Sequence, residues 1–256
     1  MLVVVATVLA VVAAVRGMWS PCGLSMLATM TPMSERLRGH RFATTATFFI
    51  FGALLGGASL GGAAALGAGL VKLAHPTDEL CAAVAVGFGI FCLLADSEVG
   101  MIRLPAIRRQ VNERWVEMYR PSVYAGGFGW QLGAGLTTYV MTAANYLLVA
   151  LGIASGSPWC AFLLCCTFGA TRGLVLLVNT KVTTSERLFA MHRFLDAHEE
   201  LSKLLCIGAE ALVIAVGAAL LVGPGGLFLG VATFAIGVVN RRRCNARALQ
   251  HELISK

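Results

Sequence analysis

The chain has 256 residues, of which 57% are hydrophobic and 13% are charged, and its mean hydropathy is +0.78. Soluble domains carry about a quarter charged residues, so this chain has too few charges to cover a water-soluble surface. The composition excludes an ordinary soluble enzyme, a disordered chain and a small disulfide-rich scaffold, and it indicates a protein that crosses a membrane several times.

Seven apolar stretches predict an all-α integral membrane protein with about seven transmembrane helices. They lie at about 2–33, 42–70, 79–97, 126–152, 158–180, 203–222 and 225–240. The expected domains are a three-span half, an amphipathic cytoplasmic connection, a second three-span half, an extra span and a basic tail, at 1–99, 100–125, 126–222, 223–240 and 241–256.

The lysines and arginines predict how the chain is oriented. Connections on alternate sides of the bundle carry 17 and 1 of these residues, and cationic loops stay in the cytoplasm. We therefore expect a multi-pass protein of the cytoplasmic (inner) membrane, with the N-terminus outside and the tail inside. Orientation alone accounts for the excess of basic residues, so the expected partner is the lipid bilayer and not nucleic acid. Residues 1–15 lack the charged n-region of a secretory signal and are expected to be a retained span.

Three segments carry further local signals. Residues 100–120 and 185–203 are amphipathic and lie between spans, so we expect two helices on the cytoplasmic membrane surface. The second span carries glycines at spacings that let transmembrane backbones approach closely: Gly52, Gly56, Gly57, Gly61 and Gly62.

The first span is too long to be one helix. Its 32 residues would reach about 48 Å, whereas the hydrocarbon core is about 30 Å thick. Pro21 lies between Gly17 and Gly23, which predicts a break at 17–23. Backbone freed at membrane depth must be buried in protein or line a cavity.

The fourth span resembles the first. Trp130 precedes Gly135-Leu136-Thr137, much as Trp19 precedes Gly23-Leu24-Ser25. Because the first span enters from outside and the fourth from inside, the two halves are expected to be inverted repeats. Such repeats place a substrate site near the midplane, at their interrupted helices.

The run Ser20-Pro21-Cys22, with Gly127-Phe128-Gly129-Trp130-Gln131-Leu132-Gly133 at the opening of the fourth span, resembles the CcdA/DsbD family of transmembrane thiol–disulfide conduits. This family lies within the LysE-type transporter superfamily, and the resemblance covers about residues 1–222. It implies transfer of reducing equivalents from a cytoplasmic thioredoxin-like protein to thiol proteins outside. Each half of a conduit presents a cysteine. Here Cys22 matches the first, and the second-half position, near 134–137, has none. The superfamily also contains small-solute exporters.

Three ionisable side chains lie inside the predicted spans. Arg172 and Glu210 fall at similar depths on consecutive antiparallel spans, which predicts a buried ion pair between them. Arg16 then has no acidic partner in the membrane. Three roles are open to it: snorkelling to the interface, bonding to carbonyls freed by the break, or facing an anionic substrate. It also lies one to two turns from Cys22, where a cation favours the reactive thiolate.

The remaining cysteines and the histidines argue against a cofactor. There is no C-x-x-C pair, so neither a thioredoxin-like motif nor a zinc site is expected. All five histidines lie in connections or the tail, so haem ligation within the spans is not expected. We therefore expect no metal and no cofactor. Cys81 and Cys160 lie near outer span ends and are candidates for a disulfide.

Two functions follow from these patterns. The first is thiol–disulfide exchange with Cys22 as the catalytic thiol and a thioredoxin-like partner. The second is transport of a small, anionic solute through a midplane site, for which the candidate residues are Arg16, Trp19, Pro21, Trp130 and Thr137. A third reading is a non-catalytic membrane subunit.

Overall fold

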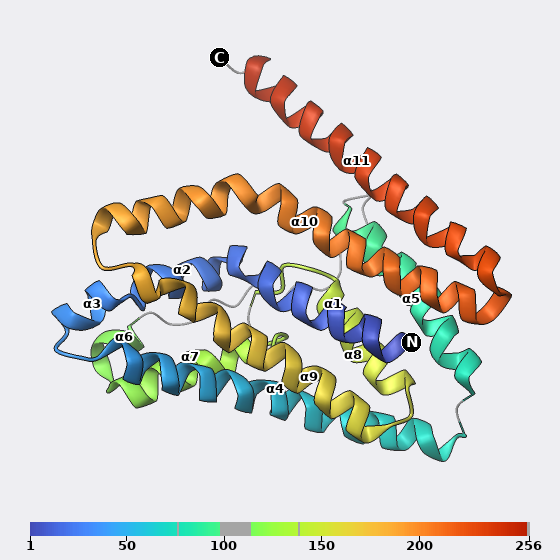
Figure 1. Ribbon diagram of the computed structural model, residues 1–256, viewed down its shortest axis with the longest axis horizontal. Coiled ribbons are helices and arrows are strands. Elements are labelled where there is room, and N and C mark those ends of the chain that lie inside the picture. The colour runs from blue at the N-terminus through green and yellow to red at the C-terminus, as the bar shows by residue number, and fades with distance from the viewer. Residues whose placement is uncertain (76, 98–113, 138, 255–256) are drawn as a thin grey trace.

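The computed structural model describes residues 1–75, 77–97, 114–137 and 139–254, and within these ranges every regular element is a helix (Figure 1). In chain order the elements are α1 (Leu2–Arg16), η1 (Gly17–Trp19), α2 (Pro21–Thr29), α3 (Pro32–Leu37), α4 (Phe42–Leu73), α5 (Asp78–Asp96), α6 (Trp115–Met118), α7 (Pro121–Gly133), α8 (Ala144–Ala154), α9 (Pro158–Leu174), η2 (Val175–Lys181), α10 (Ser185–Val222), η3 (Pro224–Gly226) and α11 (Leu227–Ile254). The all-α class predicted from the sequence is confirmed.

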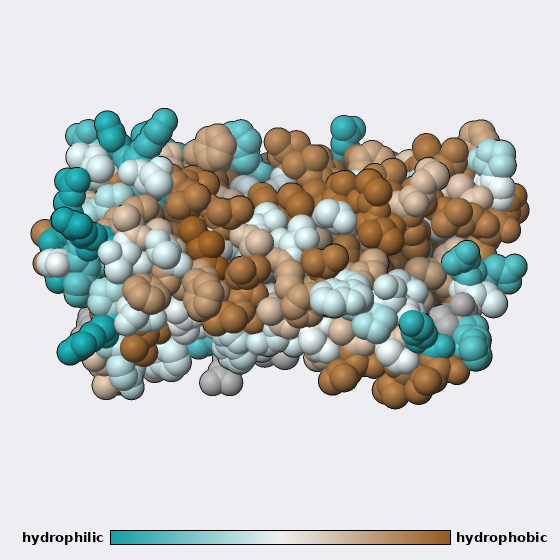
Figure 2. All heavy atoms as spheres, turned by 60° about the horizontal axis from the view of Figure 1, so that its bottom comes forward, coloured by the Kyte–Doolittle hydropathy of each residue, from teal (hydrophilic) through white to brown (hydrophobic). Residues whose placement is uncertain are grey.

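Six helical segments of the described chain are long and apolar enough to cross a membrane. They are Leu2–Trp19, Phe42–Leu73, Asp78–Asp96, Pro158–Lys181, Ser185–Val222 and Pro224–Arg243. They match six of the seven expected spans, and the fourth consists of two shorter helices, α7 and α8. On the face drawn in Figure 2, apolar side chains cover much of the long surface, and hydrophilic residues gather most clearly at its left end.

One end of the bundle is strongly basic. In Figure 1 it lies at the left, where α2, α3, α6 and the start of α10 come together. We call it the basic end and define it by six arginines: Arg36, Arg38, Arg41, Arg120, Arg187 and Arg193. The opposite end contains the N-terminus, the C-terminal end of α4 at Leu73, and the connections at 155–157 and 223–226.

The first span is broken where its sequence predicts. Helix α1 ends at Arg16, a single 3-10 turn follows, and α2 begins at Pro21. Ser20 caps α2, because its Oγ accepts a hydrogen bond from the Gly23 N–H at 3.0 Å and donates one to the Gly17 carbonyl at 2.7 Å. Proline at the first helical position has no N–H to leave unsatisfied.

The fourth span is also interrupted. Helix α7 ends at Gly133 and α8 begins at Ala144, with an irregular stretch between them. Gly135 has φ of +66°, a left-handed conformation that favours glycine. Its carbonyl accepts a hydrogen bond from Nδ2 of Asn145 at 3.2 Å. Both helix breaks expected from the sequence are therefore present.

The prediction of a separate surface helix at 185–203 is wrong. Helix α10 runs from Ser185 to Val222 without interruption. Its 38 residues span about 57 Å, so it extends well beyond one hydrocarbon core. The physical reason is that neither glycine nor proline occurs between 185 and 207 to end the helix. The other expected surface helix lies outside the described residues over 100–113, and 115–118 form the single turn α6.

The glycines of the second span make the close contacts that their spacing predicts. Helix α4 packs on α7 and α9. A Cβ added at Gly57 would lie 2.6 Å from the Cys165 carbonyl oxygen of α9, and one at Gly61 would lie 2.9 Å from the Phe162 carbonyl oxygen. Larger residues would force these backbones apart.

Helix α5 packs on α10. The break in the first span lies between two hydrophobic cores. Helix α1 belongs to a core with α8, α9 and α10, while α2 belongs to a second core with α4 and α7 near the basic end.

Candidate functional site

Cys22 lies at the start of α2, immediately after the break. It is the second residue of this nine-residue helix, and it is only 4% exposed within the second core. The N-terminal turn of a helix carries partial positive charge from its backbone N–H groups. The break therefore places Cys22 in the first turn of a helix.

Arg172 of α9 forms hydrogen bonds to both sides of this break. Its Nη1 donates to the carbonyl oxygen of Ala14 at 3.0 Å, and its Nη2 donates to Oγ of Ser20 at 3.3 Å. One guanidinium thus joins the end of α1 to the cap of α2. It lies over Gly17, where an added Cβ would collide with it.

The expected ion pair between Arg172 and Glu210 is wrong. Arg172 faces α1 and the break, whereas neither carboxylate oxygen of Glu210 has a hydrogen-bond partner within the described residues. Helix α9 packs on α1 and α4, while α10 turns a different face to α5. Counting residues from the span ends predicts the depth of each side chain in the membrane. It does not predict which neighbouring helix that side chain faces.

Arg16 is buried, with 5% of its side chain exposed, and it does have an acidic neighbour. Nη1 donates to Oγ of Ser202 at 3.0 Å, Nη2 lies 4.0 Å from Oε1 of Glu199, and the guanidinium lies 5.8 Å from the centre of the Trp19 ring. Both partners on α10 belong to the segment expected to form a surface helix. The freed carbonyl of Ala14 is bonded by Arg172 and not by Arg16.

Of the other expected binding residues, Trp19 lies beside Arg16, and the rest make contacts elsewhere. Trp19 donates its indole N–H to the Leu195 carbonyl at 2.8 Å, and Pro21 starts α2. Trp130 is 43% exposed and donates to Oγ of Ser59 on α4. Thr137 is exposed and donates to the carbonyl of Gln131. The expected substrate site is therefore not assembled as one site.

A polar cavity of about 290 Å³ lies where the two interrupted spans meet α5, α10 and α11. It is lined by Arg16, Ala95, Asp96, Met141, Glu199, Lys203, Cys206 and Arg241. Asp96 accepts hydrogen bonds from the Ala143 N–H at 2.7 Å and from the Thr142 hydroxyl. Asp96 and Thr142 were not identified from the sequence, although Asp96 is a carboxylate that closes an otherwise apolar run.

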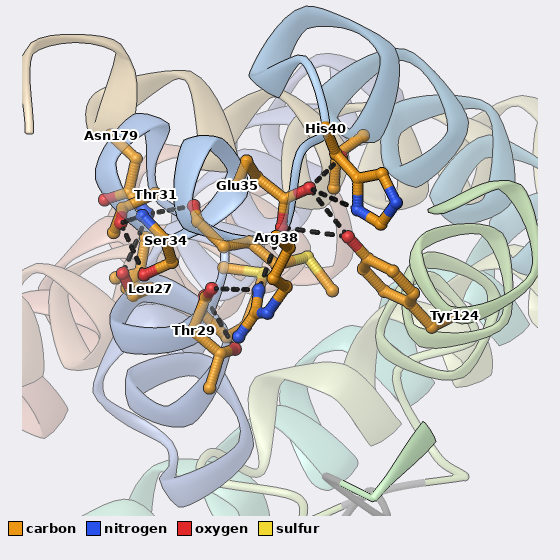
Figure 3. Close-up of polar contacts among 12 residues, drawn as sticks. Leu27, Thr29, Thr31, Ser34, Glu35, Arg38, His40, Tyr124 and Asn179 are labelled. Atoms are coloured by element: carbon orange, nitrogen blue, oxygen red, sulfur yellow. Dashed lines mark hydrogen bonds and ion pairs between the residues drawn. The ribbon is translucent and has the colours of Figure 1, made fainter. Parts of the chain in front are cut away.

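A second buried network, also missed from the sequence, holds the basic end together (Figure 3). The Glu35 carboxylate is fully buried and accepts hydrogen bonds from the Tyr124 hydroxyl at 2.7 and 2.9 Å and from the Thr45 hydroxyl at 2.6 Å. Arg38 lies 3.0 Å from it and His40 lies 3.8 Å away. This network joins α3 to α4 and α7.

Asn179 of η2 ties α2 to the same region. Its Nδ2 donates to the carbonyls of Leu27 and Met30, each at 2.8 Å. The two contacts fix the C-terminal end of the short helix that begins with Cys22 (Figure 3).

Cys81 and Cys160 line one cavity of about 530 Å³ at the opposite end of the bundle. Both are thiols in this structure. The disulfide between them remains a prediction.

No family model matches the chain, and no solved structure matches it. It is similar to three proteins named methylamine utilization protein MauF. The protein of Methylophilus methylotrophus is 28% identical over 223 residues, which cover 81% of this chain and 74% of the relative. That of Methylorubrum extorquens is 28% identical over 212 residues, covering 79% and 70%. That of Methylobacillus flagellatus is 27% identical over 208 residues, covering 77% and 71%.

Proposed function

We propose that this polytopic membrane protein carries out thiol–disulfide exchange through Cys22, as the resemblance to the CcdA/DsbD conduits implies. One observation carries the proposal: Nη2 of Arg172 donates to Oγ of Ser20, the cap residue of α2, two residues before Cys22. A helix N-terminus and a guanidinium are the surroundings in which reactive cysteines are found.

The exchange needs only one cysteine of this chain for its bonds and electrons to balance. The Cys22 thiolate attacks a disulfide of an acceptor protein, forms a mixed disulfide and releases one acceptor thiolate. A thiolate of a thioredoxin-like donor then attacks the Cys22 sulfur, forms a new mixed disulfide and releases the second acceptor thiolate. The donor's other thiolate attacks its own sulfur, closes the donor disulfide and returns Cys22 as a thiolate. Two electrons pass from donor to acceptor.

The break in the first span supplies the movement that this chemistry needs. Cys22 is 4% exposed, so a partner sulfur reaches it only when α2 shifts. Helix α2 is nine residues long and joined to α1 by a single 3-10 turn. A shift of α2 would leave α1 intact, but it would break the hydrogen bonds from Arg172 and Asn179 that hold its two ends.

We further propose that the basic end faces the cytoplasm of the inner membrane. Six arginines mark that end, whereas Lys72, Asp78 and Glu79 lie at the opposite end. The inverted-repeat prediction has support in the packing, because α4 packs on α9 and α5 packs on α10. These are the second with the fifth and the third with the sixth spans, the equivalent pairs of two inverted halves.

The names of the three relatives suggest where the exchange is used. We infer that it serves methylamine utilization in the source organism. A deletion strain should grow poorly when methylamine is supplied, the unaltered gene should restore growth, and a Cys22→Ser gene should not. Restoration by the Cys22→Ser gene would contradict the role of the thiol.

Capture of the partner tests the exchange directly. Membranes are quenched with acid, blocked with a thiol reagent and separated without reductant. We expect a mixed disulfide that disappears with reductant and in the Cys22→Ser variant. The matched control is Cys165→Ser, because Cys165 is equally buried but lies away from the break on α9. Finding the same adduct in Cys22→Ser would refute the proposal.

Transport of a small solute is the second candidate, and the polar cavity at Arg16 favours it. The cavity lies beside the breaks in the first and fourth spans, and Arg16 and Lys203 line it. If transport is the function, Arg16→Ala abolishes the growth phenotype and Cys22→Ser preserves it. If neither variant has an effect, the chain acts as a non-catalytic subunit.

A further inference from the structure

Three side chains that can ligate a metal meet beside the polar cavity, which Asp96 and Cys206 line and Glu210 does not. Asp96 ends α5, and Cys206 and Glu210 lie one turn apart on α10. One ligand atom from each lies within 4.8 Å of the other two. Cys206 is 2% exposed and Glu210 is 0% exposed, whereas Asp96 is half-buried and lines the cavity. We call these three residues the Asp96 cluster.

Glu210 is the unusual member of this cluster. Both of its carboxylate oxygens are buried, and neither accepts a hydrogen bond from an N–H or a hydroxyl group of the described residues. The neighbouring Asp96 carboxyl is the group with which Glu210 can share a proton. A buried polar group without a partner costs about 1–3 kcal/mol, and a buried charge costs more. Arg16 and Arg241 lie near enough to act on Asp96, but they bond Ser202 and Glu200 and not Glu210. A bound cation would satisfy the Glu210 carboxylate where these arginines do not.

We propose that the Asp96 cluster binds one divalent transition-metal ion of the zinc type. A thiolate and two carboxylates give three anionic ligands, which suits Zn²⁺ with a fourth position left for water or substrate. The thiolate favours zinc or cobalt over magnesium or calcium, which prefer oxygen ligands. This inference is independent of the exchange at Cys22.

The surroundings orient the ligands as a metal site requires. The Thr142 hydroxyl lies 3.0 Å from Sγ of Cys206 and donates to Asp96. The Ala143 N–H donates to the other oxygen of Asp96. Such outer partners fix ligand rotamers and are part of most metal sites. The 290 Å³ cavity gives an entry path, because Glu199 on its wall is 43% exposed.

The sequence predicted no metal because it lacks paired cysteines. This cluster draws its ligands from two helices more than a hundred residues apart, with a spacing that no short motif describes. It could be found only once α5 was seen to pack on α10.

Cobalt binding tests the site on the purified full chain in detergent. We expect one Co²⁺ per chain and a sulfur-to-cobalt charge-transfer band in the near ultraviolet. Cys206→Ser should remove the band, and Cys165→Ser, a buried thiol on α9, should keep it. Retention of the band in Cys206→Ser would overturn the proposal.

Zinc competition against cobalt gives the affinities. Thr142→Ala should weaken binding by about 10- to 100-fold, the usual effect of an outer partner, and Glu210→Gln by more. Zn²⁺ should also raise the melting temperature of the unaltered chain, and a chelator should reverse this, a measurement that needs no variant. If Zn²⁺ leaves both melting and cobalt absorption unchanged, a proton shared by Asp96 and Glu210 explains the cluster and the metal proposal fails.

Discussion

Replacing Gly17 by alanine tests the fastening of the first-span break by Arg172. A Cβ at this position would lie 2.7 Å from Nη2 of Arg172, and closer to Nη1 and Cζ. Ordinary contact begins at 3.4 Å, so Nη2 must move by at least about 0.7 Å. That movement lengthens its 3.3 Å bond to Ser20 beyond hydrogen-bond range.

The expected loss follows from the bonds that Arg172 makes. Each hydrogen bond to a charged group contributes about 1.5–3 kcal/mol, and two are disturbed. The backbone itself gains, because Gly17 has φ of −62° and alanine favours that helical region by about 1 kcal/mol. We expect a net destabilisation of about 2–5 kcal/mol for Gly17→Ala.

Denaturant unfolding of the purified chain in detergent measures this change. Gly62→Ala is the matched control, because a Cβ at Gly62 of α4 meets nothing within 4 Å, and its stability should stay equal or rise by up to about 1 kcal/mol. Arg172→Gln should add little in the Gly17→Ala background, since both changes remove the same bonds. A Gly17→Ala chain as stable as the unaltered one would refute the fastening role.

Two further predictions concern the basic end and the helix packing. Tyr124→Phe removes the hydroxyl whose proton is shared by both oxygens of buried Glu35 and should destabilise the chain by about 1–3 kcal/mol in thermal unfolding, whereas exposed Tyr119→Phe should not. Gly57→Ala should cost about 1–3 kcal/mol through contact with α9, and Gly69→Ala, whose Cβ meets nothing within 4 Å, should be neutral or stabilising.

Features fixed by local chemistry were predictable from the sequence. Proline at 21 with glycines at 17 and 23 specifies the break in the first span, because these residues disrupt a helix wherever they occur. The glycine spacing of the second span likewise predicts close packing without naming the partner helix. Apolar length located the six helices that can cross a membrane.

Features that depend on helix rotation and long-range pairing were not predictable. Arg172 and Glu210 have similar depths, but their side chains face different helices, and only the packed bundle reveals this. Asp96 and Cys206 are 110 residues apart and meet because α5 lies on α10. The extension of α10 was misjudged because amphipathic periodicity is the same in a surface helix and in a helix that continues a span.

The redox state of Cys22 in intact membranes tests the central claim most directly. Acid quenching followed by a mass-adding thiol reagent separates thiol from disulfide at this residue. We predict that Cys22 shifts from disulfide-linked to thiol when a reductant is supplied, and that Arg172→Gln slows the shift. A Cys22 that stays a thiol under both oxidising and reducing conditions would contradict thiol–disulfide exchange by this protein.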